Sequence, residues 1–126
     1  MAGLTAARDL ASRGIEVTLI ESTPFLGGRM ASLHRIYPTG RRARDVIGPL
    51  IEEVVNHPKV TVYTNAQLES ATGFIGNFLT TVRLMPRGVT GECKDPEAAI
   101  AACPEECLDQ FNLGLSRRRA IYMPYE

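Results

Sequence analysis

The sequence reads Gly3-Leu-Thr-Ala-Ala-Arg-Asp-Leu-Ala-Ser-Arg-Gly14 and then, without a break, Ile15-Glu-Val-Thr-Leu-Ile20. Apolar side chains recur in the first segment at the spacing of one helix face, and Gly14 suits the position just after the last turn of a helix. The second segment is a β-branched run of strand length. A helix that leads directly into such a strand is typical of a parallel sheet with crossover helices, so these residues predict an α/β fold.

A second helix and a second strand are predicted further along the chain. Gly48 and Pro49 suit the start of a helix, which we expect over residues 49–56 because His57-Pro58 ends the pattern. Residues 60–64 read Val-Thr-Val-Tyr-Thr, a largely β-branched run that predicts another buried strand. Together with the first helix and strand, these elements favour a Rossmann-like arrangement.

The rest of the chain predicts a hairpin and then an irregular tail. Two strand-like runs, 67–75 and 78–84, are separated by Gly76-Asn77, so we expect a β-meander hairpin attached to the parallel sheet. From Pro86 the composition changes to Gly, Pro and charge, with one short helix that Asp95 can cap. We therefore predict two regions, 1–85 with the Rossmann-like elements and 86–126 with the irregular tail.

Composition excludes several classes of protein. With 126 residues, the chain is long enough for a single globular unit but not for two cores of ordinary size. Its 14 Lys and Arg balance its 14 Asp and Glu, which argues against nucleic acid as a partner. No uncharged stretch is long enough for a transmembrane segment. The 3 cysteines, an odd number, predict free thiols of a reducing compartment, so we expect a cytoplasmic location.

The strongest functional signal is an acid at the end of the first strand with glycines on either side of it in the sequence. Glu21 follows Gly3 by close to the roughly twenty residues that separate glycine motif and acid in dinucleotide sites. The pair Gly27-Gly28, followed by Arg29, comes shortly after. In such sites the carboxylate accepts hydrogen bonds from ribose hydroxyls, and glycines let backbone N–H groups approach the pyrophosphate near a helix N-terminus.

Part of the usual dinucleotide motif is not in this sequence. The full pattern needs two glycines and a strand before Gly3. We therefore expect a partial domain whose first strand is missing, through a mis-assigned start or a cut protein. A single glycine at a helix start and an acid after a strand are also common without any cofactor, so the glycine pair at 27 and 28 carries much of the argument.

Several strings resemble those of a known family. They read Ala2-Gly-Leu-Thr-Ala-Ala-Arg-Asp-Leu-Ala-Ser-Arg-Gly14, Glu21-Ser-Thr-Pro-Phe-Leu-Gly-Gly-Arg-Met-Ala31, Ser70-Ala-Thr-Gly-Phe-Ile-Gly-Asn-Phe78 and Phe111-Asn-Leu-Gly-Leu-Ser-Arg-Arg-Arg-Ala-Ile-Tyr122. The chain closely resembles the flavin-binding A subunit of heterodisulfide reductases, and it is equally similar to the A subunit of quinone-interacting membrane-bound oxidoreductases. The resemblance implies an N-terminal fragment of an FAD-containing electron-transfer subunit that works with other subunits.

The resemblance also implies roles for individual residues. Gly3 would be the last glycine of the motif, and Glu21 would bind the ribose. The turn of Gly27, Gly28 and Arg29 would contact ribose and phosphates, and the backbone near Leu68 would meet the adenine. No catalytic residue is implied in this chain, because the isoalloxazine ring would be contacted by segments beyond Glu126.

The cysteines depart from the family pattern. Relatives carry a ferredoxin-like C-x2-C-x2-C-x3-C-P run, in which Cys93 and Cys103-Pro104 would be the first and last positions. Pro96 and Ala99 stand at the two middle positions, and neither can donate a ligand. Cys107 supplies at most a third thiol, so we expect no iron–sulfur cluster and no other metal site.

The sequence leaves a second function open. The chain could be a cofactor-free remnant that serves as a structural or interaction module, with a second copy covering an exposed sheet edge in a homodimer. No set of residues predicts hydrolytic chemistry. The two remaining hypotheses therefore differ in whether the chain binds FAD.

Overall fold

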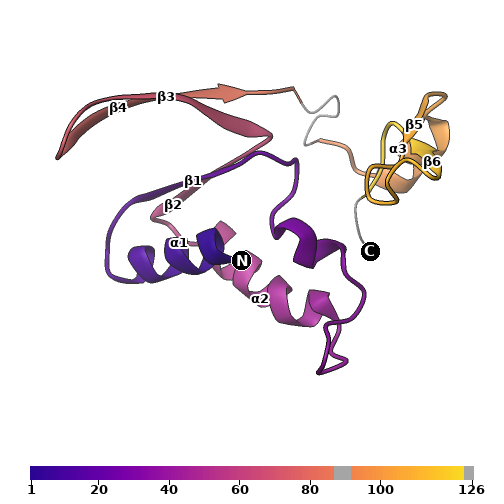
Figure 1. The fold of residues 1–126 in the computed structure, drawn as a ribbon, viewed down its shortest axis with the longest axis horizontal. Coiled ribbons are helices and arrows are strands. Elements are labelled where there is room, and N and C mark those ends of the chain that lie inside the picture. Colours follow the sequence, from indigo (N-terminus) through magenta and orange to yellow (C-terminus); the bar gives the residue numbers. More distant parts are fainter. Residues whose placement is uncertain (87–91, 124–126) are drawn as a thin grey trace. The chain divides into compact units, whose positions relative to one another are not determined.

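Helix α1 (Ala2–Ser12) leads directly into strand β1 (Val17–Glu21) in the computed structural model, which describes residues 1–86 and 92–123 (Figure 1). The helix ends as the sequence predicts. The N–H of Gly14 donates to Ala11 O at 2.9 Å, and the N–H of Ile15 donates to Leu10 O at 3.2 Å. This pair of bonds is the Schellman motif, and the φ of +86° at Gly14 is the left-handed conformation that it requires.

Strand β1 pairs in parallel with β2 (Val60–Thr64). Val17 lies opposite Val60, and Glu21 lies opposite Thr64 at the carboxyl end of both strands. The second strand and the parallel pairing are therefore confirmed, and the described elements are of mixed α/β type. The pairing places the predicted acid at the carboxyl end of the parallel strands, which is where ligands bind in open α/β folds.

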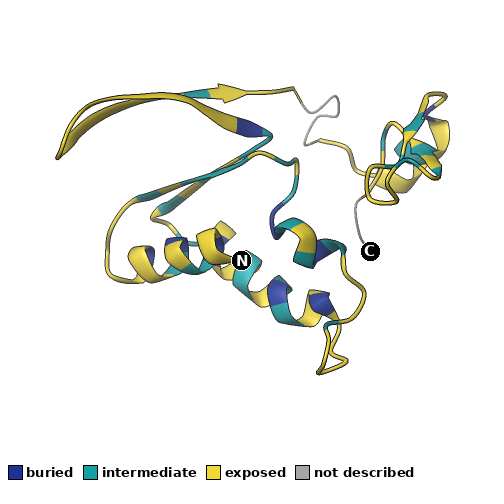
Figure 2. Ribbon diagram, in the orientation of Figure 1, coloured by how far each residue is buried: buried dark blue, intermediate teal, exposed yellow. Residues whose placement is uncertain are grey.

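The core lies between the two helices and one face of this sheet. Leu4 on α1, and Ile47 and Val54 on helix α2 (Ala43–Val55), are each no more than 4% exposed. Figure 2 shows these buried positions on both helices. The partly buried strand residues packed against this cluster are Val17, Leu19, Val60 and Val62.

The start of α2 differs from the prediction of 49–56. The helix begins at Ala43, and Pro49 lies inside it. A proline there removes one backbone hydrogen bond. Ala43 and Ile47 are nevertheless 0% and 2% exposed, so the added turns bury apolar side chains that a helix starting at Pro49 would leave outside the core. Burial of this helix face outweighs the lost hydrogen bond.

The predicted hairpin is present but forms a sheet of its own. Strands β3 (Ala66–Phe74) and β4 (Asn77–Leu84) pair antiparallel, with Phe74 opposite Asn77, so the turn is one residue earlier than predicted. Among the described residues, neither strand is hydrogen-bonded into the parallel sheet, and the predicted attachment is wrong. Asn65, which has a φ of +54°, is the single residue between β2 and β3 and redirects the chain there.

The remainder of the chain forms a second unit. The chain divides into Met1–Pro86 and Arg87–Glu126, so the expectation of a single globular unit is wrong. Helix α3 (Pro96–Ala102) is capped as predicted, because Asp95 Oδ1 accepts the N–H of Ala98 at 2.9 Å.

Two short strands follow this helix. Strands β5 (Glu106–Leu108) and β6 (Arg117–Arg119) pair antiparallel. The prediction of an irregular tail is therefore wrong for residues 106–119, where backbone hydrogen bonds between the two strands stabilise the chain locally. The parts of that prediction that concern residues 87–91 and 124–126 lie outside the described residues.

Candidate functional site

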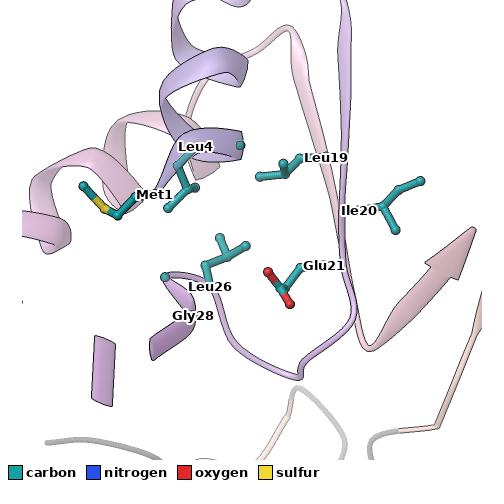
Figure 3. Close-up of a pocket in the computed structure, with 9 residues that line it drawn as sticks. Met1, Leu4, Leu19, Ile20, Glu21, Leu26 and Gly28 are labelled. Carbon is teal, nitrogen blue, oxygen red and sulfur yellow. The ribbon is translucent and has the colours of Figure 1, made fainter. Parts of the chain in front are cut away.

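A pocket of about 140 Å³ opens at the carboxyl end of β1. Three segments form it: the first turn of α1, the end of the strand and the loop that follows the strand. Figure 3 shows the residues that line it. Ordinary small-molecule sites occupy roughly 300–1,000 Å³, so this pocket encloses only part of a dinucleotide. The lining residues are Met1, Gly3, Leu4, Leu19, Ile20, Glu21, Leu26, Gly27 and Gly28.

Glu21 is the one acidic residue in this lining. Alternation along β1 directs Leu19 and Glu21 to the pocket side of the strand, while the side chain of Ile20 extends to the other side (Figure 3). Glu21 Oε1 accepts the N–H of Thr23 at 2.8 Å and lies 2.9 Å from the Thr23 hydroxyl and 3.3 Å from that of Ser22. No described residue donates to Glu21 Oε2. The turn therefore holds the carboxylate in place through one of its two oxygens.

The structure explains the presence of glycine at these two adjacent positions in different ways. Gly27 has a φ of +105°, and a Cβ there would lie 2.8 Å from Ala31 Cβ and 2.9 Å from Ile47 Cδ1. Gly28 has a φ of +57°, and nothing lies within 4 Å of the position its Cβ would take. Packing therefore requires a glycine at 27, whereas at 28 the backbone stays open to a molecule in the pocket.

The N-terminus of α1 contributes polar groups to the same pocket. The N–H of Thr5 donates to Met1 O at 3.0 Å as the first hydrogen bond of the helix. The N–H groups of Gly3 and Leu4 come before it and have no acceptor within the helix. They lie at the positive end of the helix dipole, which favours an anion. The pocket thus combines a carboxylate, which accepts hydrogen bonds from hydroxyl groups, with N–H groups that suit a phosphate.

Two predicted residues lie outside the pocket lining. Arg29 is exposed in the 3-10 helix η1 (Gly28–Ser32), directly after the glycine pair. Leu68 is on β3 and is 56% exposed. The structure thus brings Gly3, Glu21, Gly27 and Gly28 together around one space but does not bring Arg29 or Leu68 into it. Their roles stay predictions.

Sequence reasoning missed the residues that hold the acid and the apolar wall beside it. Ser22 and Thr23 bind the carboxylate, and short hydroxyl side chains directly after an acid are a signal for such a turn. Leu26 is 8% exposed and closes the pocket next to the glycine pair. An isolated leucine in a loop gives no comparable signal in sequence.

The second unit contains the cysteines. Cys93 is exposed, Cys103 is buried and Cys107 is partly buried, and all three are free thiols. A backbone hydrogen bond from Ile121 lowers the pKa of the Cys103 thiol, although burial acts in the opposite direction. Pro96 and Ala99 lie in α3, and the described residues contain no group of three His, Cys, Asp or Glu side chains placed to hold a metal ion. Also within residues 1–86 and 92–123, no helix combines the length and apolarity that crossing a membrane needs.

A family model described as flavin containing amine oxidoreductase matches residues 1–36. This segment carries the start of α1, strand β1, Glu21 and both glycines of the turn. The match thus covers the part of the chain that forms the pocket. It supports a flavin as the type of cofactor in the family.

Curated relatives match the chain over nearly its whole length. It is 42% identical over 126 residues to the iron-sulfur A subunit of the CoB–CoM heterodisulfide reductase of Methanocaldococcus jannaschii and 38% identical to an iron-sulfur A subunit of the same enzyme from Methanopyrus kandleri. The A subunit of the ferredoxin/F(420)H(2)-dependent CoB–CoM heterodisulfide reductase of Methanosarcina acetivorans is 36% identical. These matches cover 98–99% of this chain but only 16–19% of the relatives. The predicted resemblance to the A subunit of heterodisulfide reductases is confirmed.

Proposed function

We propose that this chain binds the adenosine diphosphate half of FAD. It is similar over nearly its whole length to the A subunits of heterodisulfide reductases, of which it spans about a fifth of the length or less. The observation that carries the proposal is the position of Glu21. Glu21 lines the same pocket as the glycine turn and the N-terminus of α1, and among the described residues none donates to its Oε2. A Rossmann-like domain combines these three features for the same purpose.

The residues present fit such a ligand. Glu21 Oε2 would accept hydrogen bonds from the ribose hydroxyls, because a carboxylate is an acceptor only. The open backbone at Gly28 and the N–H groups of Gly3 and Leu4, which have no acceptor within the helix, would lie along the pyrophosphate. Arg29 would add a positive charge near the phosphates, and the backbone near Leu68 would meet the adenine.

The chain would act as one part of an electron-transfer oxidoreductase subunit. The flavin supplies the redox chemistry, while Glu21, Gly27 and Gly28 bind and orient its nucleotide half. Relatives are named as subunits of heterodisulfide reductases, so we propose other subunits of an electron-transfer complex as partners and the cytoplasm as the location.

The second unit would be a degenerate ferredoxin-like insert without an iron–sulfur cluster. This differs from the relatives that are named iron-sulfur subunits. It follows from Pro96 and Ala99, which cannot replace thiolate ligands. The relatives give no support to the cofactor-free homodimer that the sequence leaves open.

Replacement of the acid tests the proposal. Glu21→Gln keeps one acceptor oxygen for the Thr23 N–H but removes the charge that binds the ribose. Because hydrogen bonds to charged groups contribute about 1.5–3 kcal/mol, we expect FAD to bind at least about tenfold more weakly, as measured by flavin fluorescence titration. The matched control is Glu16→Gln, since Glu16 is exposed just before β1.

Two results would contradict the proposal. Unchanged FAD affinity in the Glu21→Gln variant would show that the acid has another role. A wild-type chain that binds neither FAD nor ADP would remove the proposed function altogether.

A further inference from the structure

One polar atom next to the site has no hydrogen-bond partner. The hydroxyl oxygen of Thr64 is shielded from solvent, and no described residue forms a hydrogen bond with it. Leaving a buried hydroxyl unpaired is unfavourable, because its hydrogen bonds to water are lost and not replaced. Buried polar groups in native proteins are nearly always paired, so an unpaired one at the edge of a binding pocket indicates an interaction that forms in another state.

The register of the sheet places this hydroxyl beside the acid. Thr64 is directly opposite Glu21, at the carboxyl end of the neighbouring parallel strand. Val62 and Leu19, two residues earlier on the two strands, are also register partners, and both pack against the core. Because side chains alternate along a strand, Thr64 and Glu21 lie on that same face, on strands about 4.8 Å apart.

The carboxylate of Glu21 has an oxygen that can accept a hydrogen bond from Thr64. Glu21 Oε1 is occupied by the Ser22 and Thr23 turn, whereas no described residue donates to Oε2. A carboxylate oxygen accepts two hydrogen bonds, so Oε2 can receive one from the Thr64 hydroxyl and still receive one from a ribose hydroxyl.

We propose that Thr64 is a positioning residue for nucleotide binding: its hydroxyl donates to Glu21 Oε2 when a ribose occupies the pocket and fixes the carboxylate against the ribose. Thr64 acts through Glu21 and does not touch the ligand. This inference rests on the proposed function, since it concerns the same pocket. It assigns to β2 a part in a site that otherwise comes from α1, β1 and the loop after it.

Calorimetric titration of the full chain with ADP tests the inference. Thr64→Val keeps the shape of the side chain and removes the hydroxyl, and we expect roughly tenfold weaker ADP binding. Thr64→Ser keeps a donor and should retain the wild-type affinity within about twofold. The matched control is Thr61→Val, which makes the same change at an exposed position on the opposite face of β2.

Two further measurements distinguish positioning from a general structural role. In a Glu21→Ala background no side-chain atom is left at position 21 to pair with the Thr64 hydroxyl, so adding Thr64→Val should cost little further affinity. The melting temperature of the nucleotide-free Thr64→Val variant should equal or exceed that of wild type, because the hydroxyl forms no hydrogen bond with any described residue.

The outcomes separate this inference from the proposed function. If wild type binds ADP and Glu21→Gln weakens binding while Thr64→Val does not, the inference alone is overturned. It is also overturned if Thr64→Val lowers the melting temperature and weakens ADP binding equally in both backgrounds. If wild type does not bind ADP at all, the proposed function fails and the inference with it.

Discussion

At the scale of single residues, Gly27 and Gly28 show how neighbours of the same type serve different ends. Gly27 is buried against Ala31 and Ile47, where a side chain has no room. Gly28 has a positive φ and open space around it. The first glycine therefore contributes to folding, and the second keeps the pocket accessible.

This difference predicts unequal effects of alanine at the two positions. Gly27→Ala combines backbone strain with a collision in the core, and we expect the free energy of unfolding to fall by about 3 kcal/mol. Gly28→Ala adds only the strain of the left-handed backbone conformation, and we expect the free energy of unfolding to fall by about 1 kcal/mol. Urea unfolding followed by far-ultraviolet circular dichroism measures both. Equal losses for the two variants would show that the packing around Gly27 is not as described.

At the scale of elements, helix α2 is held by one narrow face. Val54 is 0% exposed, whereas the next residue, Val55, is 49% exposed. The helix carries Pro49 in its interior, so its intrinsic hydrogen bonding is incomplete. Contacts of the buried face with α1 and the parallel sheet must supply the stability that the backbone lacks.

Paired valine variants measure this contribution. Val54→Ala removes two buried methyl groups from the core and should lower the free energy of unfolding by about 2 kcal/mol. Val55→Ala makes the same chemical change on the exposed face and should change it by less than about 0.5 kcal/mol. Denaturant titrations of both variants provide the comparison. A larger loss for Val55→Ala would mean that the other face of α2 is the packed one.

At the scale of the whole molecule, the chemistry is divided between the two units. All residues that line the pocket belong to Met1–Pro86, and all 3 cysteines of the sequence belong to Arg87–Glu126. The cysteines stand at Cys93, Cys103 and Cys107, while the intervening positions Pro96 and Ala99 lack ligand atoms. The lining of the proposed nucleotide site therefore contains no thiol.

Anaerobic incubation with iron and sulfide tests this division. We expect the chain not to acquire the four iron atoms of a [4Fe–4S] cluster, because such clusters are held by four thiolates. Replacing all three cysteines with serine should leave the affinity for ADP unchanged within about twofold. Iron analysis and visible absorption measure the first outcome, and calorimetry measures the second. Stoichiometric, stable cluster formation would contradict the expectation.

The sequence by itself determined the features that arise from local chemistry. The helix stop at Gly14, the strand at 60–64 and the cap at Asp95 each depend on a residue and its near neighbours, and each was predicted correctly. The same holds for the position of Glu21 at the end of β1. Such features follow from backbone preference and hydrogen bonding over a few residues.

Only the tertiary structure decided the features that depend on distant partners. The start of α2 at Ala43 follows from burial against the core, and the separate hairpin follows from the reversal at Asn65, so neither could be read from a local pattern. The pairing of Thr64 with Glu21 joins residues from two strands that a helix separates in the sequence. Burial and strand register are set by the packing of the folded chain, so no local stretch contains the information that specifies them.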